Sequence, residues 1–486
     1  SFNNMEWAQL FLNENNIGKE GHNNHLYGAT FDLFAAYIET KLNVNNYQNI
    51  YFLKHLINFC IFYASSIIFY YLIKKRFNSN FLSFLAFLFY ITSPRIFAES
   101  FYNSKDIIFM SFMIFAIFFG IKLLKNNKIK NIILFSLFCA LATSIRAMGV
   151  FILVLALGFI IIENFEKKNF TYEKVKSIFL IFIFYFLFTY LFWPYLWLDP
   201  INGLITSLKT LTYNQYGWGG SNFYFGNYVK ATNVPWHYSF VWIAISTPLI
   251  YSFFFILGSY KILHDFFSNL ENLWKNLNEK LDLFILLFFF TALLVVILLN
   301  STLYDGWRHL YFIYPALIYI LIIGLKYLLS FKNNQIYKNI VYLTVVISIF
   351  INIFNIIKLH PFQNIYFNIL VEKKANSLFA IDYWGLGNAH SVKKILDDMD
   401  NDKIVSVRTA SFTPLRFTKY IINREKLKKL NFSGTEGSES EYVFTNYIYE
   451  GNPKYKEKYF IGENYKKIYT LSRGNIIINE VFKKVD

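Results

Sequence analysis

Long apolar runs alternate with short polar connectors along most of the chain. Each run is about 15 to 25 residues long, enough to cross a hydrocarbon core of about 30 Å as a helix. Apolar residues fill these runs on every side and do not recur at amphipathic spacing. The pattern predicts an all-α polytopic membrane protein with about ten spans. The expected spans are 50–73, 80–97, 106–124, 130–145, 147–162, 175–195, 239–262, 282–300, 309–328 and 338–358.

Lys and Arg fall in alternate connectors, which predicts the topology. The basic connectors lie around 74–76, 122–130, 167–176, 275–280 and 326–338. Basic connectors of membrane proteins face the cytoplasm. The outward segments are then 1–49, 98–105, 196–238, 301–308 and the tail from about 359. We expect a multi-pass protein of the bacterial cytoplasmic (inner) membrane with both ends outside.

The character of the chain changes after residue 358. The stretch NSLFAIDYWGLGNAHSVKKILDDMDNDKIVSVRTA predicts a strand, a loop, a helix and a strand, and EYVFTNYIY and GNIIINEVF predict two more strands. We expect residues 1–358 to form a transmembrane domain and 359–486 a small extracytoplasmic α/β domain. Within it, DYWGLGNAH (382–390) is either an ordinary strand-to-helix turn or a surface for the acceptor or the outer loops.

Composition supports this interpretation and limits the partners. Hydrophobic residues make up 55% of the chain and charged residues 16%. The 47 basic and 31 acidic residues give a net charge of +16, which in a soluble protein would suggest a nucleic-acid partner. Most of the excess lies in the connectors, so we expect membrane lipids as neighbours and no nucleic acid.

Common catalytic motifs are missing from the sequence. It contains no P-loop, no dinucleotide fingerprint, no HExxH and no GxSxG. Nucleotide-driven and hydride-transfer chemistry is therefore not expected. A substrate that is already activated and lies on the outer face fits better.

The stretch SPRIFAESFYNSKDIIF places several ionisable side chains at a membrane edge, where such residues are costly. In a structural interpretation Pro94 ends one helix, Asp106 is a first-turn acid, and Arg95 and Lys105 are interfacial anchors. In a functional interpretation Asp106 is a catalytic acid or base supported by Glu99, and Arg95 and Lys105 attract an anion.

Three further basic residues lie at the outer side. Arg146, in LATSIRAMGVFIL, is either a surface arginine or a ligand of a lipid phosphate, which a guanidinium matches bidentately. Arg308 and His309, in YDGWRHLYFIYP, belong either to an interfacial aromatic belt or to a phosphate clamp.

Aromatic residues collect in the long outer segment 196–238 and just before it. Long structured loops are often functional, and ring faces beside amide donors suit a sugar. An interfacial belt explains them equally well. The candidate sugar- or acceptor-binding residues are Trp193, Tyr195, Trp218, Trp236 and His237.

Taken in order, LYGATFDLFAAYIE, SPRIFAESFYNSKDI, Arg146, PWHY and RHLYFIYP resemble the GT-C superfamily of polyprenyl-phosphate-sugar-dependent glycosyltransferases. The protein O-mannosyltransferases and the lipid A aminoarabinose transferases are the most similar members. The resemblance implies a helical bundle that moves a sugar from a polyprenyl-phosphate donor to a protein, lipid or glycan acceptor outside the membrane. Asp106 matches the second-loop acid, Arg146 and Arg308 match phosphate-binding cations, and Arg95 matches only loosely.

One family feature is missing. The family places an acid in its first outer loop, just after its first span. Glu6, Glu14, Glu20 and Asp32 remain in this chain, but none has the matching context. We expect that acid and one further helix to lie upstream of Ser1; if Ser1 were the native start, catalysis would be in doubt.

The implied chemistry requires no cofactor. A base takes the acceptor proton while fixed cations stabilise the leaving phosphate, and direct attack inverts the anomeric carbon. We expect no bound metal, although a divalent cation between Asp106, Glu99 and the upstream acid remains an alternative.

Two other function classes compete with a transferase. A lipid or glycan transporter or flippase predicts charges deep within spans, inverted repeats and broken helices, whereas the charges here lie at the outer edge. A non-catalytic membrane scaffold, with the terminal domain as its binding module, is favoured if the first-loop acid is truly missing.

Overall fold

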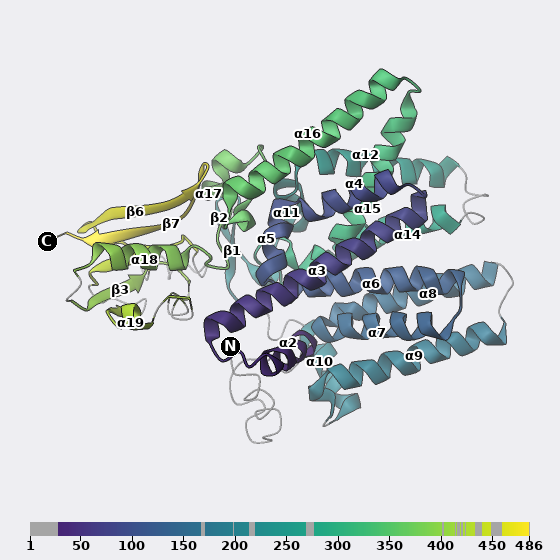
Figure 1. The fold of residues 1–486 in the computed structure, drawn as a ribbon, viewed down its shortest axis with the longest axis horizontal. Helices are drawn as coiled ribbons and strands as arrows, with labels where there is room; N and C mark the ends of the chain where they lie inside the picture. Colours follow the sequence, from purple (N-terminus) through teal and green to yellow (C-terminus); the bar gives the residue numbers. More distant parts are fainter. Residues whose placement is uncertain are drawn as a thin grey trace.

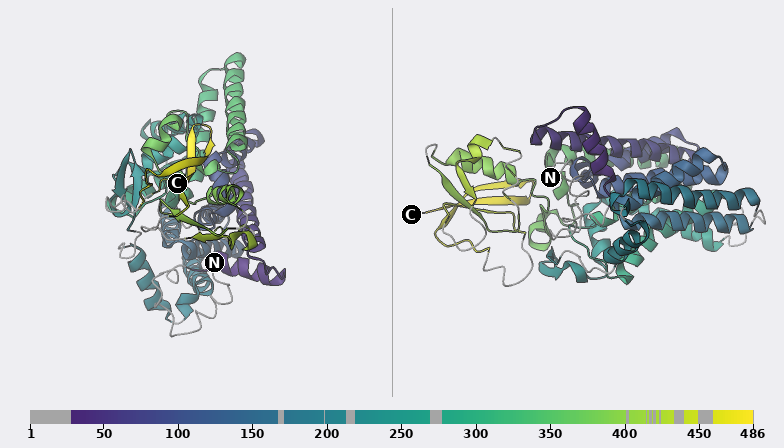
Figure 2. Two further views of the ribbon diagram at one scale, coloured as in Figure 1. Left: turned by 90° about the vertical axis from the view of Figure 1, so that its left-hand side faces the viewer. Right: turned by 90° about the horizontal axis from the view of Figure 1, so that it is seen from below.

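The helical part of the chain forms one elongated bundle with a β-sheet domain at one end (Figures 1 and 2). The computed structural model describes residues 28–485 except 167–170, 198, 213–218, 269–276, 401–402, 414, 416–417, 419–420, 423, 433–439 and 449–458. The bundle helices are α2 (Thr30–Lys41), α3 (Tyr47–Phe77), α4 (Asn80–Ile91), α5 (Pro94–Tyr102), α6 (Asp106–Lys125), α7 (Ile129–Ile145), α8 (Val150–Glu166), α9 (Tyr172–Phe192), α10 (Pro200–Thr212), α11 (Tyr238–Ser246), α12 (Leu249–Ser268), α14 (Leu277–Leu298), α15 (Tyr314–Phe331) and α16 (Gln335–Leu359). The predicted helical fold class is confirmed.

The number of spans differs from the prediction. Six helices in the described chain are long and apolar enough to cross a membrane: α3, α6, α9, α14, α16 and the segment Arg308–Phe331, which contains α15. α4 and α5 form a seventh candidate that is bent by 67°. The runs 130–145 and 147–162 form the shorter helices α7 and α8, and 239–262 is divided between α11 and α12. The count of about ten is therefore not confirmed.

The bend between α4 and α5 positions the acidic cluster. A single straight helix over 80–97 was expected, but Pro94 has no N–H to continue α4, and Ser93 before it is extended, with φ −72° and ψ 116°. Pro94 then fits the first turn of α5. The last turn of α5 is thereby brought beside the first turn of α6.

The centre of the bundle is a close contact between α12 and α15. A Cβ atom on Gly258 would lie 1.9 Å from the carbonyl oxygen of Ile320, and one on Gly324 would lie 2.0 Å from that of Phe254. Only glycine permits backbones to approach this closely, as at many helix contacts within membranes.

We expect Gly258→Ala to destabilise the bundle by about 2 kcal/mol or more, because the new methyl group overlaps backbone that cannot move alone. Thermal unfolding of the full-length protein in nanodiscs measures the change. Gly158→Ala is the matched control, since Gly158 lies in α8 with nothing within 4 Å of its Cβ position. Equal unfolding temperatures for the two variants would contradict the proposed contact.

A buried ion pair joins three helices at the end of the bundle away from the sheet domain. Asp282 of α14 accepts from Arg76 Nε of α3 at 2.8 Å, and its same Oδ1 accepts from Tyr319 Oη of α15 at 2.7 Å. The pair has its hydrogen bonds satisfied within the core, so we interpret it as structural.

The C-terminal domain contains a five-stranded mixed sheet of order β4-β3-β5-β7-β6. The strands are β3 (Val405–Thr409), β4 (Leu430–Phe432), β5 (Tyr442–Thr445), β6 (Tyr465–Arg473) and β7 (Ile476–Lys484). β3 runs parallel to β4 and β5, and β7 runs antiparallel to β5 and β6. Helix α18 (Asn388–Asp398) packs with them through the fully buried Val392 and Ile395.

The first strand predicted for this domain, near residues 377–382, is wrong. Phe379 forms only an isolated bridge, with Tyr224 of the hairpin β1–β2 (Ser221–Tyr224 and Asn227–Lys230). Ala380 N donates to Phe223 O at 3.1 Å. The apolar run therefore pairs with the hairpin β1–β2 and not with the five-stranded sheet.

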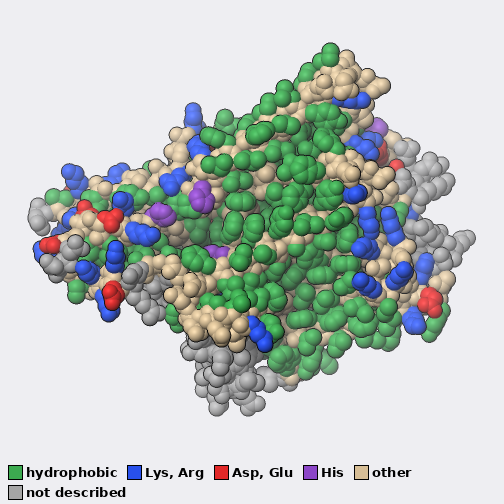
Figure 3. Space-filling view, in the orientation of Figure 1, with side chains coloured by type: hydrophobic (Ala, Val, Ile, Leu, Met, Phe, Trp, Pro, Cys, Tyr) green, Lys and Arg blue, Asp and Glu red, His purple; other side chains and the backbone are tan. Residues whose placement is uncertain are grey.

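The two sets of connectors lie at opposite ends of the bundle. Hydrophobic side chains cover its middle, and Lys and Arg gather at the end far from the sheet domain (Figure 3). The hairpin β1–β2, the 301–307 connector and the C-terminal domain contact one another at the other end. Chain folding therefore separates the connectors as their charges predict, while the side of the membrane that each end faces stays a prediction.

Candidate functional site

Asp106 is the centre of a buried charge cluster at the sheet-domain end of the bundle. It is 1% exposed in the first turn of α6. Its Oδ1 accepts a hydrogen bond from Arg146, directly after α7. Its Oδ2 accepts from Arg308 Nη1 at 2.8 Å and from Asn103 Nδ2 at 3.0 Å. Two guanidinium groups from distant parts of the chain thus meet on one carboxylate.

Glu99 forms a second buried carboxylate beside this pair. It is 2% exposed on the last turn of α5. Its Oε2 accepts from Asn103 Nδ2 at 2.7 Å, so Asn103 lies between the two acids. Its Oε1 accepts from Trp384 Nε1 of the C-terminal domain at 3.2 Å. Within the described part of the chain Glu99 takes part in no ion pair, which distinguishes it from Asp106.

Arg308 is held by charge and by aromatic rings. It begins the 3-10 helix η5 (Arg308–Ile313). Besides Asp106, its Nε lies 3.4 Å from Asp305 Oδ2. Asp305 and Gly306 form a turn with φ +57° and +68°, which brings that carboxylate back toward the arginine. Burial, partly opposed by Arg308, raises the pKa of Asp305 to about 6.

Arg95 and His309, two of the remaining predicted cations, form no ion pair with Asp106 in the described structure. Arg95 is 5% exposed and donates to Tyr366 O at 3.3 Å, with its guanidinium over the rings of Trp242 and Phe367, so no contact in the described structure joins it to Asp106. His309 packs edge-on against Tyr304 at 4.6 Å between ring centroids.

Lys105 precedes α6 and is half-buried beside the cluster. Burial and the nearby Arg146 lower its pKa to about 7, against the opposing effect of Asp106. Its charge therefore changes close to neutral pH.

The predicted aromatic residues do not converge on Asp106. Trp218 lies outside the described residues. Trp193 is fully buried after α9, where Tyr195 follows it in a 3-10 turn, and Trp236 is 68% exposed. His237 Nδ1 forms a 2.7 Å hydrogen bond with Tyr224 Oη. His237 therefore lies at the hairpin β1–β2, and the described contacts give no link from Trp193 or Trp236 to the charge cluster.

Among the acids weighed as substitutes for a first-loop base, Asp32 alone belongs to the described residues. Glu6, Glu14 and Glu20 lie outside the described residues. Asp32 is exposed on α2. No ion pair within 4 Å links Asp32 to another described side chain.

Sequence reasoning missed Asn103 and Asp305, and it included Trp384 only as part of the stretch 382–390. Asn103 stands four residues after Glu99 and three before Asp106, a spacing at which side chains meet across a helical turn. The pair Asp305–Gly306 is a turn signal that precedes Arg308 by a few residues. The partner of Trp384 has no local signal, because Trp384 meets Glu99 across 285 positions of sequence.

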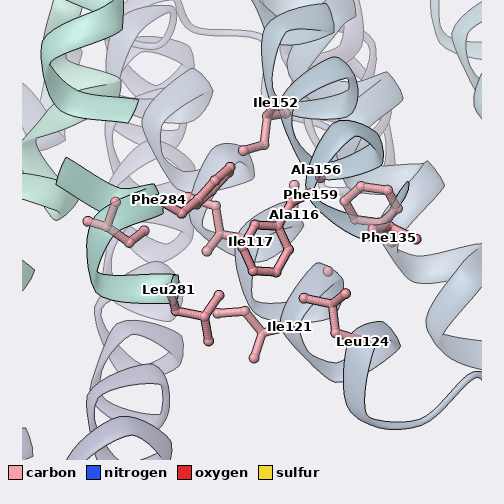
Figure 4. Close-up of a pocket in the computed structure, with 13 residues that line it drawn as sticks. Ala116, Ile117, Ile121, Leu124, Phe135, Ile152, Ala156, Phe159, Leu281 and Phe284 are labelled. Carbon is pink, nitrogen blue, oxygen red and sulfur yellow. The ribbon is translucent and has the colours of Figure 1, made fainter. Parts of the chain in front are cut away.

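Neither of the two cavities considered contains the cluster. Figure 4 shows one of them, lined by aliphatic and phenylalanine side chains of α6, α7, α8 and α14, with a volume of about 30 Å³ that excludes a sugar. The other, of about 450 Å³, lies between α12 and α16 and is lined in part by Tyr366 and Phe367, which contact Arg95. No group of three His, Cys, Asp or Glu placed to hold a metal occurs among the described residues.

The cluster is chemically suited to a phosphate and to proton transfer. Buried guanidinium groups bind phosphate oxygens strongly, since they are weakly hydrated and offer paired donors. A phosphate would share Arg146 and Arg308 with Asp106. Glu99, which forms no ion pair within 4 Å in the described structure, is the carboxylate better placed to accept a proton.

Comparison with known proteins supports the resemblance found in the sequence. Residues 34–193 match the model of the dolichyl-phosphate-mannose-protein mannosyltransferase family, a segment that contains Glu99, Asp106 and Arg146. Among solved structures, ArnT from Cupriavidus metallidurans bound to undecaprenyl phosphate is similar, with 7% identity, a TM-score of 0.42, and coverage of 94% of this chain and 88% of that one. No curated protein sequence matches the chain. The family model thus bears out the predicted resemblance to protein mannosyltransferases over residues 34–193, about a third of the chain.

Proposed function

Taking the family match over residues 34–193 as the premise, we propose that this protein is an integral membrane glycosyltransferase with a polyprenyl-phosphate-sugar donor. The observation that carries the proposal is Asp106, buried between Arg146 and Arg308 with Glu99 beside it. Buried charge of this kind at a membrane edge is costly and marks functional sites. The acceptor is a protein, lipid or glycan.

The proposed reaction uses the cluster directly. Glu99 takes the proton of an acceptor hydroxyl while the oxygen of that hydroxyl attacks the anomeric carbon of the donor sugar. The bond from that carbon to the phosphate oxygen breaks, and the polyprenyl phosphate leaves with its charge on Arg146 and Arg308. Direct attack inverts the anomeric carbon. We assign Asp106 the task of orienting the two guanidinium groups, and the cations carry the phosphate charge without a metal cofactor.

The orientation of the protein is part of the proposal. The basic connectors gather at the end opposite the cluster, and basic connectors face the cytoplasm. The cluster and the C-terminal domain then face the outside of a bacterial cytoplasmic membrane. A donor in the outer leaflet would bring its phosphate to the level of Asp106.

Binding of undecaprenyl phosphate tests the proposed function. The full-length protein in phosphatidylcholine nanodiscs is titrated with undecaprenyl phosphate and, in parallel, with phosphatidylglycerol. We expect selective binding of undecaprenyl phosphate, reduced about tenfold or more in Arg146→Gln and Arg308→Gln because each removes charge-assisted hydrogen bonds. Equal affinity for both lipids, unchanged in both variants, would return the arginines to a structural role.

The charge of Lys105 predicts a pH dependence of this binding. The pKa of Lys105 is lowered to about 7, so the side chain is cationic below that pH and neutral above it. Affinity for undecaprenyl phosphate should therefore fall as pH rises from about 6 to about 8, by roughly fivefold for one lost cation–phosphate contact.

Lys105→Arg is the control for this dependence, because arginine stays charged throughout the range. The ratio of wild-type to variant affinity removes the titration of the phosphate itself and of residues common to both proteins. Arg146 and Arg308 lower the pKa of Lys105, whereas Asp106 raises it. The test is therefore whether the ratio of the two affinities changes with pH. A ratio that stays constant from pH 6 to 8 would contradict the prediction.

A further inference from the structure

Trp384, in the C-terminal domain, contacts both Glu99 and Arg308 of the charge cluster. Its Nε1 donates to Glu99 Oε1 at 3.2 Å. Its ring centroid lies 5.3 Å from Arg308 Cζ, and the ring also meets Tyr102 of α5 edge-on at 5.4 Å. One side chain from the sheet domain thus contacts the proposed base and one of the proposed phosphate-binding cations.

Tyr383 adds a second ring from the same loop. Its centroid lies 5.3 Å from Arg308 Cζ and 5.8 Å from the ring of Tyr304. Tyr304 lies on the guanidinium from the bundle side at 4.6 Å. Three aromatic rings therefore surround Arg308, and such contacts hold a cation electrostatically while restricting its rotamers.

The loop that carries the two aromatic residues is held firmly. Asp382 is fully buried, and its carboxylate accepts from Leu386 N at 3.1 Å and from Gly387 N at 2.9 Å. Gly385 has φ +64°, and a Cβ there would lie 2.7 Å from Asn388 Nδ2. The backbone path that this aspartate and glycine impose fixes where Tyr383 and Trp384 leave the chain.

We infer that the C-terminal domain completes the phosphate site and that Trp384 is a positioning residue for Glu99 and Arg308. The inference rests on the proposed function and adds a part of the chain that lies outside the segment matched by the family. Trp384 acts through two separable contacts, an N–H donated to Glu99 and a ring laid on Arg308. The ligand is a lipid-linked phosphate, a diester in the sugar donor and a monoester in the product that leaves.

Three variants of the full-length protein separate the two contacts. Trp384→Phe keeps a ring and loses the N–H, Trp384→Gln keeps an N–H donor and loses the ring, and Trp384→Ala loses both. With undecaprenyl phosphate in nanodiscs as the probe, we expect Trp384→Ala to lower affinity about tenfold. The Phe and Gln variants should each lose about threefold, since each retains one contact.

Trp197→Ala is the matched control. Trp197 is half-exposed after α9, and its Nε1 donates to Tyr190 O at 2.8 Å, so the substitution also removes a ring and a hydrogen bond. Its affinity should equal that of the wild type. A merely structural role for Trp384 predicts instead that Trp384→Gln, which has lost the packed ring, is as weak as Trp384→Ala.

The outcomes separate this inference from the proposed function. If Trp384→Ala, Phe and Gln all bind as the wild type while Arg308→Gln loses binding, the inference is overturned and the proposed function stands. If Arg308→Gln also binds undecaprenyl phosphate with wild-type affinity, the proposed function is overturned, and the inference that rests on it is overturned as well. If Trp384→Ala does not fold, judged by its thermal unfolding, the Phe and Gln variants decide alone: partial loss in both supports the inference, and no loss overturns it.

Discussion

Asp106→Asn is expected to reduce sugar transfer by about 10² or more while undecaprenyl phosphate still binds at least as tightly as to the wild type. The carboxylate competes with phosphate for Arg146 and Arg308, so neutralising it frees both guanidinium groups for the ligand. The same change removes the charge that sets their positions. Transfer should fall because the arginines no longer meet the leaving oxygen in the productive arrangement.

Sugar transfer by this variant is measured by mass spectrometry as the loss of the polyprenyl-phosphate-linked sugar. Binding is measured by titration with undecaprenyl phosphate. Asp305→Asn is the matched control, because Asp305 also lies beside Arg308 but does not contact Arg146 in the described structure. We expect a smaller loss of transfer in that control. Equal loss of binding and transfer in Asp106→Asn would place Asp106 in ligand binding.

A stability cost should accompany this variant. Breaking a buried ion pair by removing one charge costs about 3 kcal/mol or more, because the partner charge stays buried. The thermal unfolding temperature of Asp106→Asn should therefore fall unless undecaprenyl phosphate is added, in which case the ligand replaces the missing anion.

Arg308→Gln is expected to cause the largest loss of transfer, about 10³-fold, since it removes a cation from the leaving phosphate and leaves Asp106 and Asp305 without that partner. Arg308→Lys keeps the charge but not the planar pair of donors, so its loss should be intermediate. Transfer is measured as for Asp106→Asn, with lipid binding and thermal unfolding alongside.

Arg95→Gln provides the comparison for this prediction. Arg95 is a buried arginine at the same end of the bundle, but it bonds to Tyr366 O and stacks on Trp242 and Phe367. Its replacement should cost transfer much less than Arg308→Gln. If the two variants were equally impaired, the loss would reflect buried positive charge in general and not the contact of Arg308 with Asp106.

Local sequence was sufficient to predict the helical fold class and to place together the part of the charge cluster that lies within residues 99–106. The apolar runs have the length of membrane helices, and Glu99, Asn103 and Asp106 lie within one stretch whose spacing already places them together. The break before Pro94 follows from proline chemistry alone, and the sequence was interpreted both as a span over 80–97 and as a helix that ends at Pro94. The separation of basic connectors from the others also follows from composition.

The places of the candidate aromatic residues could not be predicted because composition does not give direction, and their binding role stays a prediction. Trp193 and Trp236 share a residue type and lie just before and within the segment 196–238, yet one is fully buried and the other largely exposed, and neither meets the charge cluster in the described structure. The strand predicted near Phe379 failed for a similar reason. An apolar run shows that a segment is buried, but its pairing partner lies elsewhere in the chain.

The sequence by itself determined that this is a helical membrane protein and that its basic connectors gather at one end of the bundle. It also determined which acids and arginines carry a free-energy cost at the membrane high enough to indicate a function. Those properties depend on length, hydropathy and charge, which are local. Only the tertiary structure decided that Arg146 and Arg308 meet on Asp106 and that Trp384 reaches Glu99. Such contacts join positions 40 to 285 residues apart, and they form because packing of whole helices, and of one domain on another, brings those side chains together.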